Sequence, residues 1–311
     1  MNRPWPELSY VAGRETFATL HLWTQVIGKV RLALTPWLNH SWHVPLYVTA
    51  RGLSSSLIRH GDRFFELEFD FNRHVLRIEV SDATQREVRL QPRSVADFYA
   101  AVMQALTELE IGVQMDERPC EIAAATPFSQ DAIHAAYDAQ CAQRLWQVLL
   151  RVDGVFRLFR SGFLGKCSPV HFFWGSFDLA VTRFSGRAAP RFQGKAPGVS
   201  AAVMREAYSH EVSSAGFWPG GGGVDYPCFY SYAYPLSERF RTAAVAPPQA
   251  AFETTLGEFL LPYEVVRSAP DPEATLLSFL QSTYRAAAAA TGWDAALECA
   301  PGVPGVPRPV D

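Results

Sequence analysis

The chain has 311 residues, of which 48% are hydrophobic, and it carries a formal net charge of -3 at pH 7. A chain of this length can bury roughly three quarters of its unfolded surface, so its core needs neither metals nor disulfides. The 28 lysines and arginines are spread rather than clustered, which argues against a nucleic-acid partner. There is no run of roughly 18 apolar residues and no Cys-x-x-Cys pair among the five cysteines. We therefore expect a cytoplasmic protein that does not cross a membrane.

The first half of the chain predicts a helix, several strands and a closing helix. Leu22-Trp23 lies in a segment with helical periodicity. Ser94 is placed to cap the closing helix, and Asp97 follows in its first turn. Between these helices, β-favouring residues predict strands at 42–49, 63–70 and 74–80.

The second half follows the same order. A second Leu-Trp pair, at Leu145, lies in a helical segment that we expect to run from Ser129 to about Arg160. Asp271 and Pro272 predict the N-cap and first position of the closing helix. The strand-like segments between them are 170–180 and 228–234.

Antiparallel strands flanked by helices indicate an α+β fold. The shared order predicts two diverged helix–strands–helix repeats packed together, with long helices covering the sheets. The expected units are 1–122 for the first repeat and 123–299 for the second, which includes the connecting helix and a glycine-rich loop. Residues 300–311 are rich in proline and glycine and are expected to be disordered. The alternative to duplication is coincidence, because Leu-Trp pairs and capped helices are common.

Polar residues recur on the first helix and on the strand that follows it. His21, Gln25 and Lys29 are four residues apart and share one helix face. His43 and Arg51 share one strand face by the period of two. Each face could meet solvent or line a polar cavity, so all five are candidate ligand-binding residues.

The segment 170–180 is almost continuously apolar and aromatic, as expected of a strand covered on both faces. A carboxylate there, at Asp178, needs a cationic or hydrogen-bonding partner, and Arg183 and Arg187 lie close along the chain. They could form a structural ion pair or hold a substrate. His171 and Asp178 have opposite parity, so along one strand they share a site only across a bulge or a pocket rim.

The segment 208–223 is the strongest candidate for chemistry. It places His210 and Glu211 ahead of Trp218 and four glycines. We expect an irregular loop, with the glycines as hinges of a lid and Trp218 as its cover. The alternative is a surface connection that its aromatic residues fasten to the core.

Three motifs carry a family resemblance: HVPLYVTARG at 43–52, SGFLGKCSPVHFFWGSFD at 161–178 and YSHEVSSAGFWPGG at 208–221. They resemble the motifs of a family of uncharacterised bacterial proteins of about this length, whose domain has no known function. The resemblance covers nearly the whole chain. It implies kinship and supplies no activity, cofactor or catalytic residue.

The sequence lacks the phosphate-binding, dinucleotide-binding, zinc-protease and nucleophile-elbow motifs. One hypothesis is then an enzyme acting on a small molecule by acid–base chemistry, with a metal-assisted variant that spacing does not support. Its candidate catalytic residues are His210, Glu211, His171 and Asp178. The candidate substrate-binding residues are His21, Gln25, Lys29, His43, Arg51, Trp174, Arg183, Arg187, Trp218 and Tyr230.

The second hypothesis is an aromatic-lined pocket that binds a ligand without converting it, with Trp174, Trp218 and Tyr230 among its walls. A third is an interaction protein with exposed aromatic residues. The sequence identifies no cofactor, and it leaves open the substrate and the oligomeric state, a homo-oligomer included.

Overall fold

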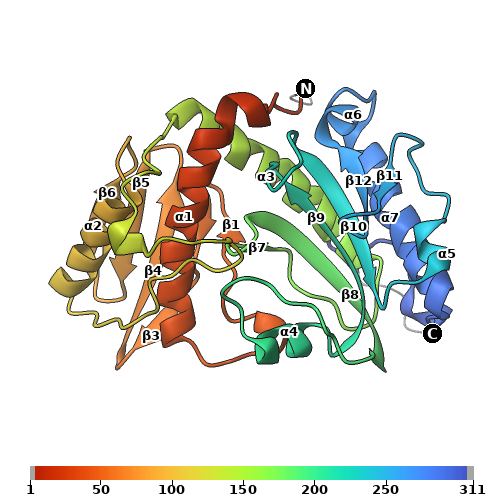
Figure 1. Ribbon diagram of the computed structural model, residues 1–311, viewed down its shortest axis with the longest axis horizontal. Helices are drawn as coiled ribbons and strands as arrows, with labels where there is room; N and C mark the ends of the chain where they lie inside the picture. The colour runs from red at the N-terminus through yellow and green to blue at the C-terminus, as the bar shows by residue number, and fades with distance from the viewer. Residues whose placement is uncertain (1–3, 307–311) are drawn as a thin grey trace.

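The computed structural model describes residues 4–306, and within them the chain forms two antiparallel sheets accompanied by helices (Figure 1). The predicted α+β class is confirmed. The helices are α1 (Tyr10–Leu34), α2 (Val95–Glu108), α3 (Ala139–Ser161), α4 (Ala201–Ala207), α5 (Glu238–Arg241), α6 (Tyr263–Arg267) and α7 (Pro272–Thr291), with short 3-10 turns η1 (Asn39–Ser41), η2 (Phe128–Gln130) and η3 (Ala295–Leu297).

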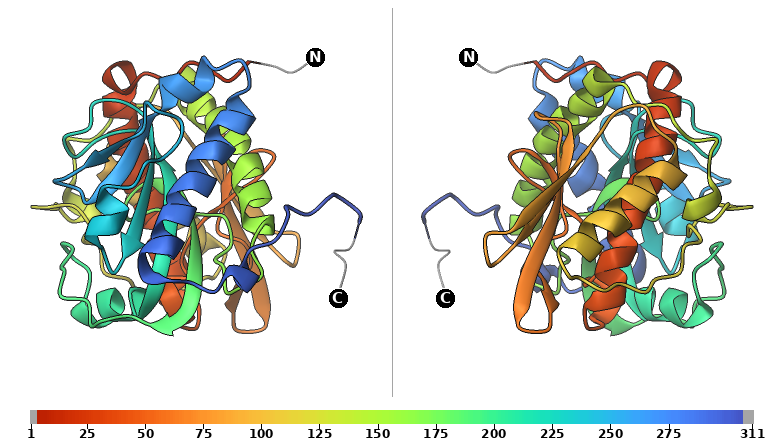
Figure 2. Two further views of the ribbon diagram at one scale, coloured as in Figure 1. Left: turned by 90° about the vertical axis from the view of Figure 1, so that its right-hand side faces the viewer. Right: turned by 90° about the vertical axis from the view of Figure 1, so that its left-hand side faces the viewer.

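The first sheet has the order β1-β2-β4-β5-β6, with β3 paired to β4. Alternate residues of its strands pack against α1 and α2, which lie over it in Figure 2. Ser94 caps α2 by accepting a hydrogen bond from the amide of Asp97, as predicted. The strands are β1 (Tyr47–Val48), β2 (Gly52–Ser54), β3 (Ile58–His60), β4 (Arg63–Asp70), β5 (Val75–Val80) and β6 (Gln85–Arg89).

The second sheet has the order β11-β12-β10-β9-β8-β7. One face packs against α7 and α3 (Figure 2), and the opposite face looks toward α1. Asp271 caps α7 and Pro272 occupies its first turn, as predicted. The strands are β7 (His171–Phe173), β8 (Asp178–Ala188), β9 (His210–Trp218), β10 (Cys228–Tyr234), β11 (Ala251–Glu253) and β12 (Glu258–Pro262).

The two halves meet where β1 and β7 lie side by side. Leu46 and Phe172 exchange two backbone hydrogen bonds of 2.9 and 2.7 Å. The long helix α1 lies between the halves, and Trp23, Val26 and Ile27 at its centre are fully buried (Figure 1). Each half has six strands between a long opening helix and a long closing helix, and in the second half the short helices α4, α5 and α6 are inserted. Origin by duplication stays a prediction, as do the unit bounds 1–122 and 123–299.

The connecting helix is shorter than predicted. It does not begin at Ser129, because the side chain of Asp131 accepts hydrogen bonds from the amides of Ile133 and His134 and holds a turn instead. The cap of α3 is Asp138, which bonds the amide of Cys141.

The predicted strand 42–49 is also mostly irregular. His40 and Ser41 have positive φ angles, and Pro45 has no amide hydrogen to give to a ladder. Within 42–49 only Tyr47 and Val48 form a strand, and Leu46 adds a single bridge to Phe172, so the expected shared strand face of His43 and Arg51 is not formed.

The segment 170–180 is a hairpin rather than one strand. A turn over 174–177 separates β7 from β8 and pairs Phe173 with Asp178. Partners in an antiparallel pair share a face, so His171 and Asp178 lie on the same face of the sheet. The prediction from a single strand, that these two residues point to opposite faces, was wrong because they lie on two paired strands separated by a turn.

Most of the predicted loop 208–223 is the central strand β9, which pairs with β8 on one side and β10 on the other. Only 219–224, which contains the four glycines, is a loop. No helix between residues 4 and 306 has the length and apolar character that crossing a bilayer requires. Of the predicted disordered tail, 300–306 contains no helix or strand, and 307–311 lie outside the described residues.

Candidate ligand-binding site

A hollow of about 860 Å³ lies between α1, the connector that follows α2 and one face of the second sheet. This volume is in the range of small-molecule sites. Because side chains alternate along strands, every second residue of the sheet reaches it. These residues are Asp178, Ala180 and Thr182 of β8, Ser214 and Trp218 of β9, Tyr230 and Tyr232 of β10, and Glu258 of β12.

Asp178 forms the floor of the hollow. It is 5% exposed, and its carboxylate accepts hydrogen bonds from the Ser176 hydroxyl at 2.6 Å and from the Tyr230 hydroxyl. The Tyr230 ring reaches it by crossing Gly216, where a Cβ would lie 2.3 Å from the ring. Burial raises the pKa of Asp178, and the two hydrogen bonds oppose that rise.

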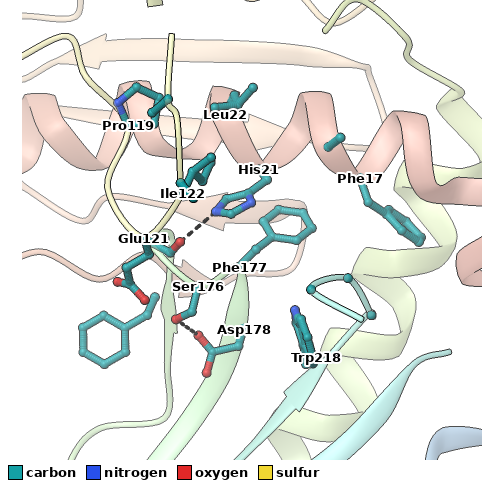
Figure 3. A pocket seen from close by; sticks show the side chains of 18 of the residues that line it. Phe17, His21, Leu22, Pro119, Glu121, Ile122, Ser176, Phe177, Asp178 and Trp218 are labelled. Carbon is teal, nitrogen blue, oxygen red and sulfur yellow. Dashed lines mark hydrogen bonds between the residues drawn. The ribbon is translucent and has the colours of Figure 1, made fainter. Parts of the chain in front are cut away.

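Two further carboxyl groups share the hollow. Burial, and next the charge of Asp178, raise the pKa of Glu121 and that of Glu258 from 4.5 to about 7. Glu121 is an exposed residue of the connector, and its carboxyl group lies over the inner side of the hollow (Figure 3), where a Cβ on Gly175 would be 2.2 Å from Oε1. Neither glutamate side chain has a hydrogen bond or ion pair with another residue of the described range.

His21 reaches the hollow from α1 (Figure 3). Its Nε2 lies 2.8 Å from the carbonyl oxygen of Gly175, and its ring stacks on Phe177 with the centroids 5.2 Å apart. Burial lowers the pKa of His21 to about 4, so the ring is neutral at pH 7. Phe177 ends the turn with a φ of 60°, an unusual angle for an aromatic residue, and it leads directly into Asp178.

Gln25 does not line the hollow but contacts the connector that does. Its Oε1 accepts a hydrogen bond from the amide of Cys120 at 2.9 Å, and its Nε2 donates one to the carbonyl of the same residue at 3.0 Å. This pair of bonds fixes the connector next to Glu121. Gln25 therefore positions a carboxyl group of the hollow.

Aromatic residues form much of the rim. Figure 3 shows Trp218 and the glycine loop on one side of Asp178 and Glu121 on the other. Tyr10 packs on this loop, where a Cβ on Gly220 would lie 2.8 Å from its ring.

Apart from His21, which is neutral at pH 7, the basic side chains that line this hollow have acidic partners. Arg14 lies 3.2 Å from Glu15, and the Nδ1 of His134 lies 2.7 Å from Asp131. Neither Glu15 nor Asp131 is one of the three carboxyl groups whose pKa values are raised. The charge of Asp178, Glu121 and Glu258 is therefore left uncompensated by the described protein.

The structure does not bring His210, Glu211 or Arg187 to the hollow. Glu211 forms an ion pair with Arg187 at 2.7 Å, and Arg187 also bonds the carbonyl of Thr291 at the end of α7. His210 contacts the Ser209 hydroxyl at 3.0 Å and lines neither this hollow nor its neighbour. This group fastens β9 to α7.

Arg183 is not the partner of Asp178 either. It lies on the opposite face of the sheet, fully buried, with its guanidinium carbon 3.6 Å from the ring centroid of Phe159 and 4.3 Å from that of Tyr284. Adjacent residues of a strand point to opposite faces, so Arg183 cannot reach the side that Thr182 lines.

The remaining candidates lie elsewhere. Lys29 is 3.6 Å from Asp116, and Arg51 is 3.0 Å from Glu68 in the first sheet. His43 accepts a hydrogen bond from the amide of Leu38. Lys29, His171 and Trp174 line a second, neighbouring hollow.

Sequence reasoning missed Glu121 and Glu258. Glu121 belongs to an irregular connector without periodicity, so nothing in the sequence indicates its direction. Glu258 opens the apolar run Phe259-Leu260-Leu261, and a single acid at the start of such a strand was the one available signal.

The chain matches the model of a family of unknown function (DUF5996) over residues 5–299. The protein belongs to this family. No similar protein was found among the curated proteins or among the solved structures. For DUF5996 the site must therefore be interpreted from its own geometry. Within residues 4–306, no three His, Cys, Asp or Glu side chains are grouped so that they could hold one metal ion.

Proposed function

We propose that the hollow of this DUF5996 protein binds a small organic cation through Glu121, Asp178 and Glu258. The observation that carries the proposal is that these three carboxyl groups line one hollow in which none of them has a cationic partner among the described residues. Burial, and next the charge of Asp178, raise the pKa of both glutamates to about 7, which supports it. The charge of Asp178 disfavours that of each glutamate, and no ion pair within residues 4–306 joins a cation to any of the three acids, so a ligand cation would stabilise the site.

The aromatic walls support the same ligand class. Trp218, Tyr230 and Tyr232 line the hollow together with Phe177 and Tyr208. Faces of aromatic rings attract ammonium groups, and quaternary ammonium ions are commonly bound in aromatic cages. Acids and aromatic faces together favour an organic ammonium ion over an anion or a sugar.

The acids are also spread over the hollow rather than focused on one point. No metal-binding cluster exists among the described residues, and a volume of about 860 Å³ exceeds what an inorganic ion requires. Both facts favour an organic ligand.

Isothermal titration with tetramethylammonium chloride at pH 8 tests the proposal, with sodium chloride at equal ionic strength as the reference. Asp178→Asn removes the charge and keeps an oxygen for one of the two hydroxyl donors, Ser176 or Tyr230, and it should weaken binding roughly tenfold or more. The matched control is Glu253→Gln on the neighbouring strand, which removes one exposed charge opposite Glu258. The control should bind like the wild type. No heat above the sodium reference, or equal binding by Asp178→Asn, would contradict the proposal.

A second candidate is catalysis on the bound cation. A carboxyl group with a pKa of about 7 can accept or donate a proton at neutral pH, and both Glu121 and Glu258 meet this condition. Native mass spectrometry of freshly purified protein, followed by NMR of any amine it releases, separates the candidates. Conversion of that amine by the wild type, with loss of turnover in Glu258→Gln, would favour an enzyme.

A further inference from the structure

A second hollow, of about 420 Å³, adjoins the first. The two share part of their lining, so the same side chains form a wall that is reached from either side. This shared wall consists of Glu121, Phe173, Ser176, Thr182, Tyr208 and Tyr232. The two hollows are therefore adjacent, close enough for one molecule that extends past these side chains to reach both.

The second hollow differs in chemistry from the first. Its lining is dominated by aromatic and aliphatic side chains, among them Trp42, Trp174, Phe184, Val203 and Met204. The rings and chains come from η1, the β7–β8 turn, β8 and α4, which are far apart in sequence. Such a lining favours an apolar group over a charged one.

One buried polar side chain in this second hollow has no partner. His171 is 1% exposed and belongs to the lining, yet neither of its ring nitrogens makes a hydrogen bond with a described residue. A buried polar group without a partner is costly, and native proteins rarely keep one. A hydrogen-bonding group on a ligand would supply what the imidazole lacks.

The charged residues around the second hollow are compatible with an apolar ligand group. The ammonium group of Lys29 lies 3.6 Å from the carboxylate of Asp116. The Nε2 of His40 lies 2.6 Å from the ammonium group of Lys166, and the His40 amide donates a hydrogen bond to the carboxylate of Glu206. Glu121 belongs to the shared wall and faces the first hollow as well. The charge of Lys29 thus has an acidic partner nearby, and most of the other lining side chains are apolar.

We infer that the second hollow receives the apolar part of the ligand whose cationic group lies among the acids of the first. The ligand class is then an amphipathic organic cation: an ammonium group joined to an alkyl or aryl extension with a hydrogen-bonding group near His171. This inference rests on the proposed function and specifies its ligand.

A homologous series of alkyltrimethylammonium ions tests the inference. Tetramethylammonium and its butyl, hexyl and octyl analogues keep their charge at every pH, so only the chain changes. Each added methylene should tighten the dissociation constant roughly threefold to fourfold until the second hollow is filled. Isothermal titration at pH 8 measures the series.

Val203→Trp on α4 would fill the second hollow without touching the acids. It should abolish the gain with chain length while leaving tetramethylammonium affinity unchanged. Ala202→Trp, on the exposed side of the same helix, is the matched control and should keep both. Val199→Phe blocks the same hollow from the preceding loop if Val203→Trp fails to fold by circular dichroism.

The outcomes separate the two proposals. Tetramethylammonium binding without any chain-length gain would overturn the inference and leave the proposed function standing. A gain that survives both blocking variants would place the chain elsewhere and would also overturn it. Failure of tetramethylammonium itself to bind would overturn the proposed function, and the inference with it.

Discussion

Each sheet of this protein buries a carboxylate, and the two are treated differently. In the first sheet, Glu68 is 4% exposed and accepts hydrogen bonds from Thr49 at 2.7 Å, Arg51 at 3.0 Å and Arg77 at 2.8 Å. In the second sheet, Asp178 is similarly buried but receives only neutral hydroxyl donors, from Ser176 and Tyr230.

The presence or absence of a cationic donor distinguishes a structural acid from a ligand-binding one. Glu68 is fully compensated within the protein, so its burial contributes to the fold. Asp178 has no cation near it, and its charge raises the pKa of Glu121 and Glu258 instead of being neutralised. A carboxylate that is about equally buried thus has cationic partners in the first sheet and none in the second.

The largest expected effect is on stability in the first sheet. Arg77→Leu leaves the buried Glu68 with only the half-exposed Arg51 as a cation, and it should lower the free energy of unfolding by about 3 kcal/mol. Asp178→Asn should change it by less than about 1 kcal/mol or raise it, because an uncompensated buried charge is removed. Urea unfolding at pH 7 measures both, and equal losses in the two variants would break the comparison.

A smaller effect is the pH dependence of cation binding. The pKa values of Glu121 and Glu258 are about 7, so both groups lose their protons, and gain charge, as pH rises through 7. Tetramethylammonium affinity should therefore increase between pH 6 and pH 8, by up to about tenfold per pH unit, and level off above. The double variant Glu121→Gln/Glu258→Gln should bind weakly with a flat profile. A wild-type profile that is flat over this range would show that neither group titrates there.

The smallest expected effect is at His210, which the sequence suggested as a catalytic residue. It lines neither hollow, so His210→Ala should change tetramethylammonium affinity by less than about twofold, whereas Asp178→Asn weakens it strongly. Parallel isothermal titrations compare the two. A tenfold loss of tetramethylammonium affinity in His210→Ala would show that His210 belongs to the binding site.

The sequence predicts what is decided locally. The caps Ser94 and Asp271 were predicted because a cap needs only one side chain and a nearby amide. The turn that separates His171 from Asp178 was not predicted, because an unbroken apolar run looks the same in one strand as in a hairpin.

The candidate site was predictable only in part, for a related reason. The sequence predicts His21, Asp178, Trp218 and Tyr230 as candidates from their chemical type and local pattern, and all four line the first hollow. Glu121 joins them only because Gln25 holds the connector against α1, a contact between residues far apart in the chain. Pairings such as Arg187 with Glu211 likewise depend on strand register, which a single sequence does not specify.

The most direct test of the uncompensated acids is to titrate them. Carbon-13 NMR of the glutamate side-chain carboxyl groups, with Glu121→Gln and Glu258→Gln for assignment, gives their pKa values with and without saturating tetramethylammonium. We expect two glutamates that titrate near pH 7 in the free protein and whose pKa values fall toward 4.5 when the cation is bound. Ordinary values in the free protein, unchanged by the cation, would contradict it.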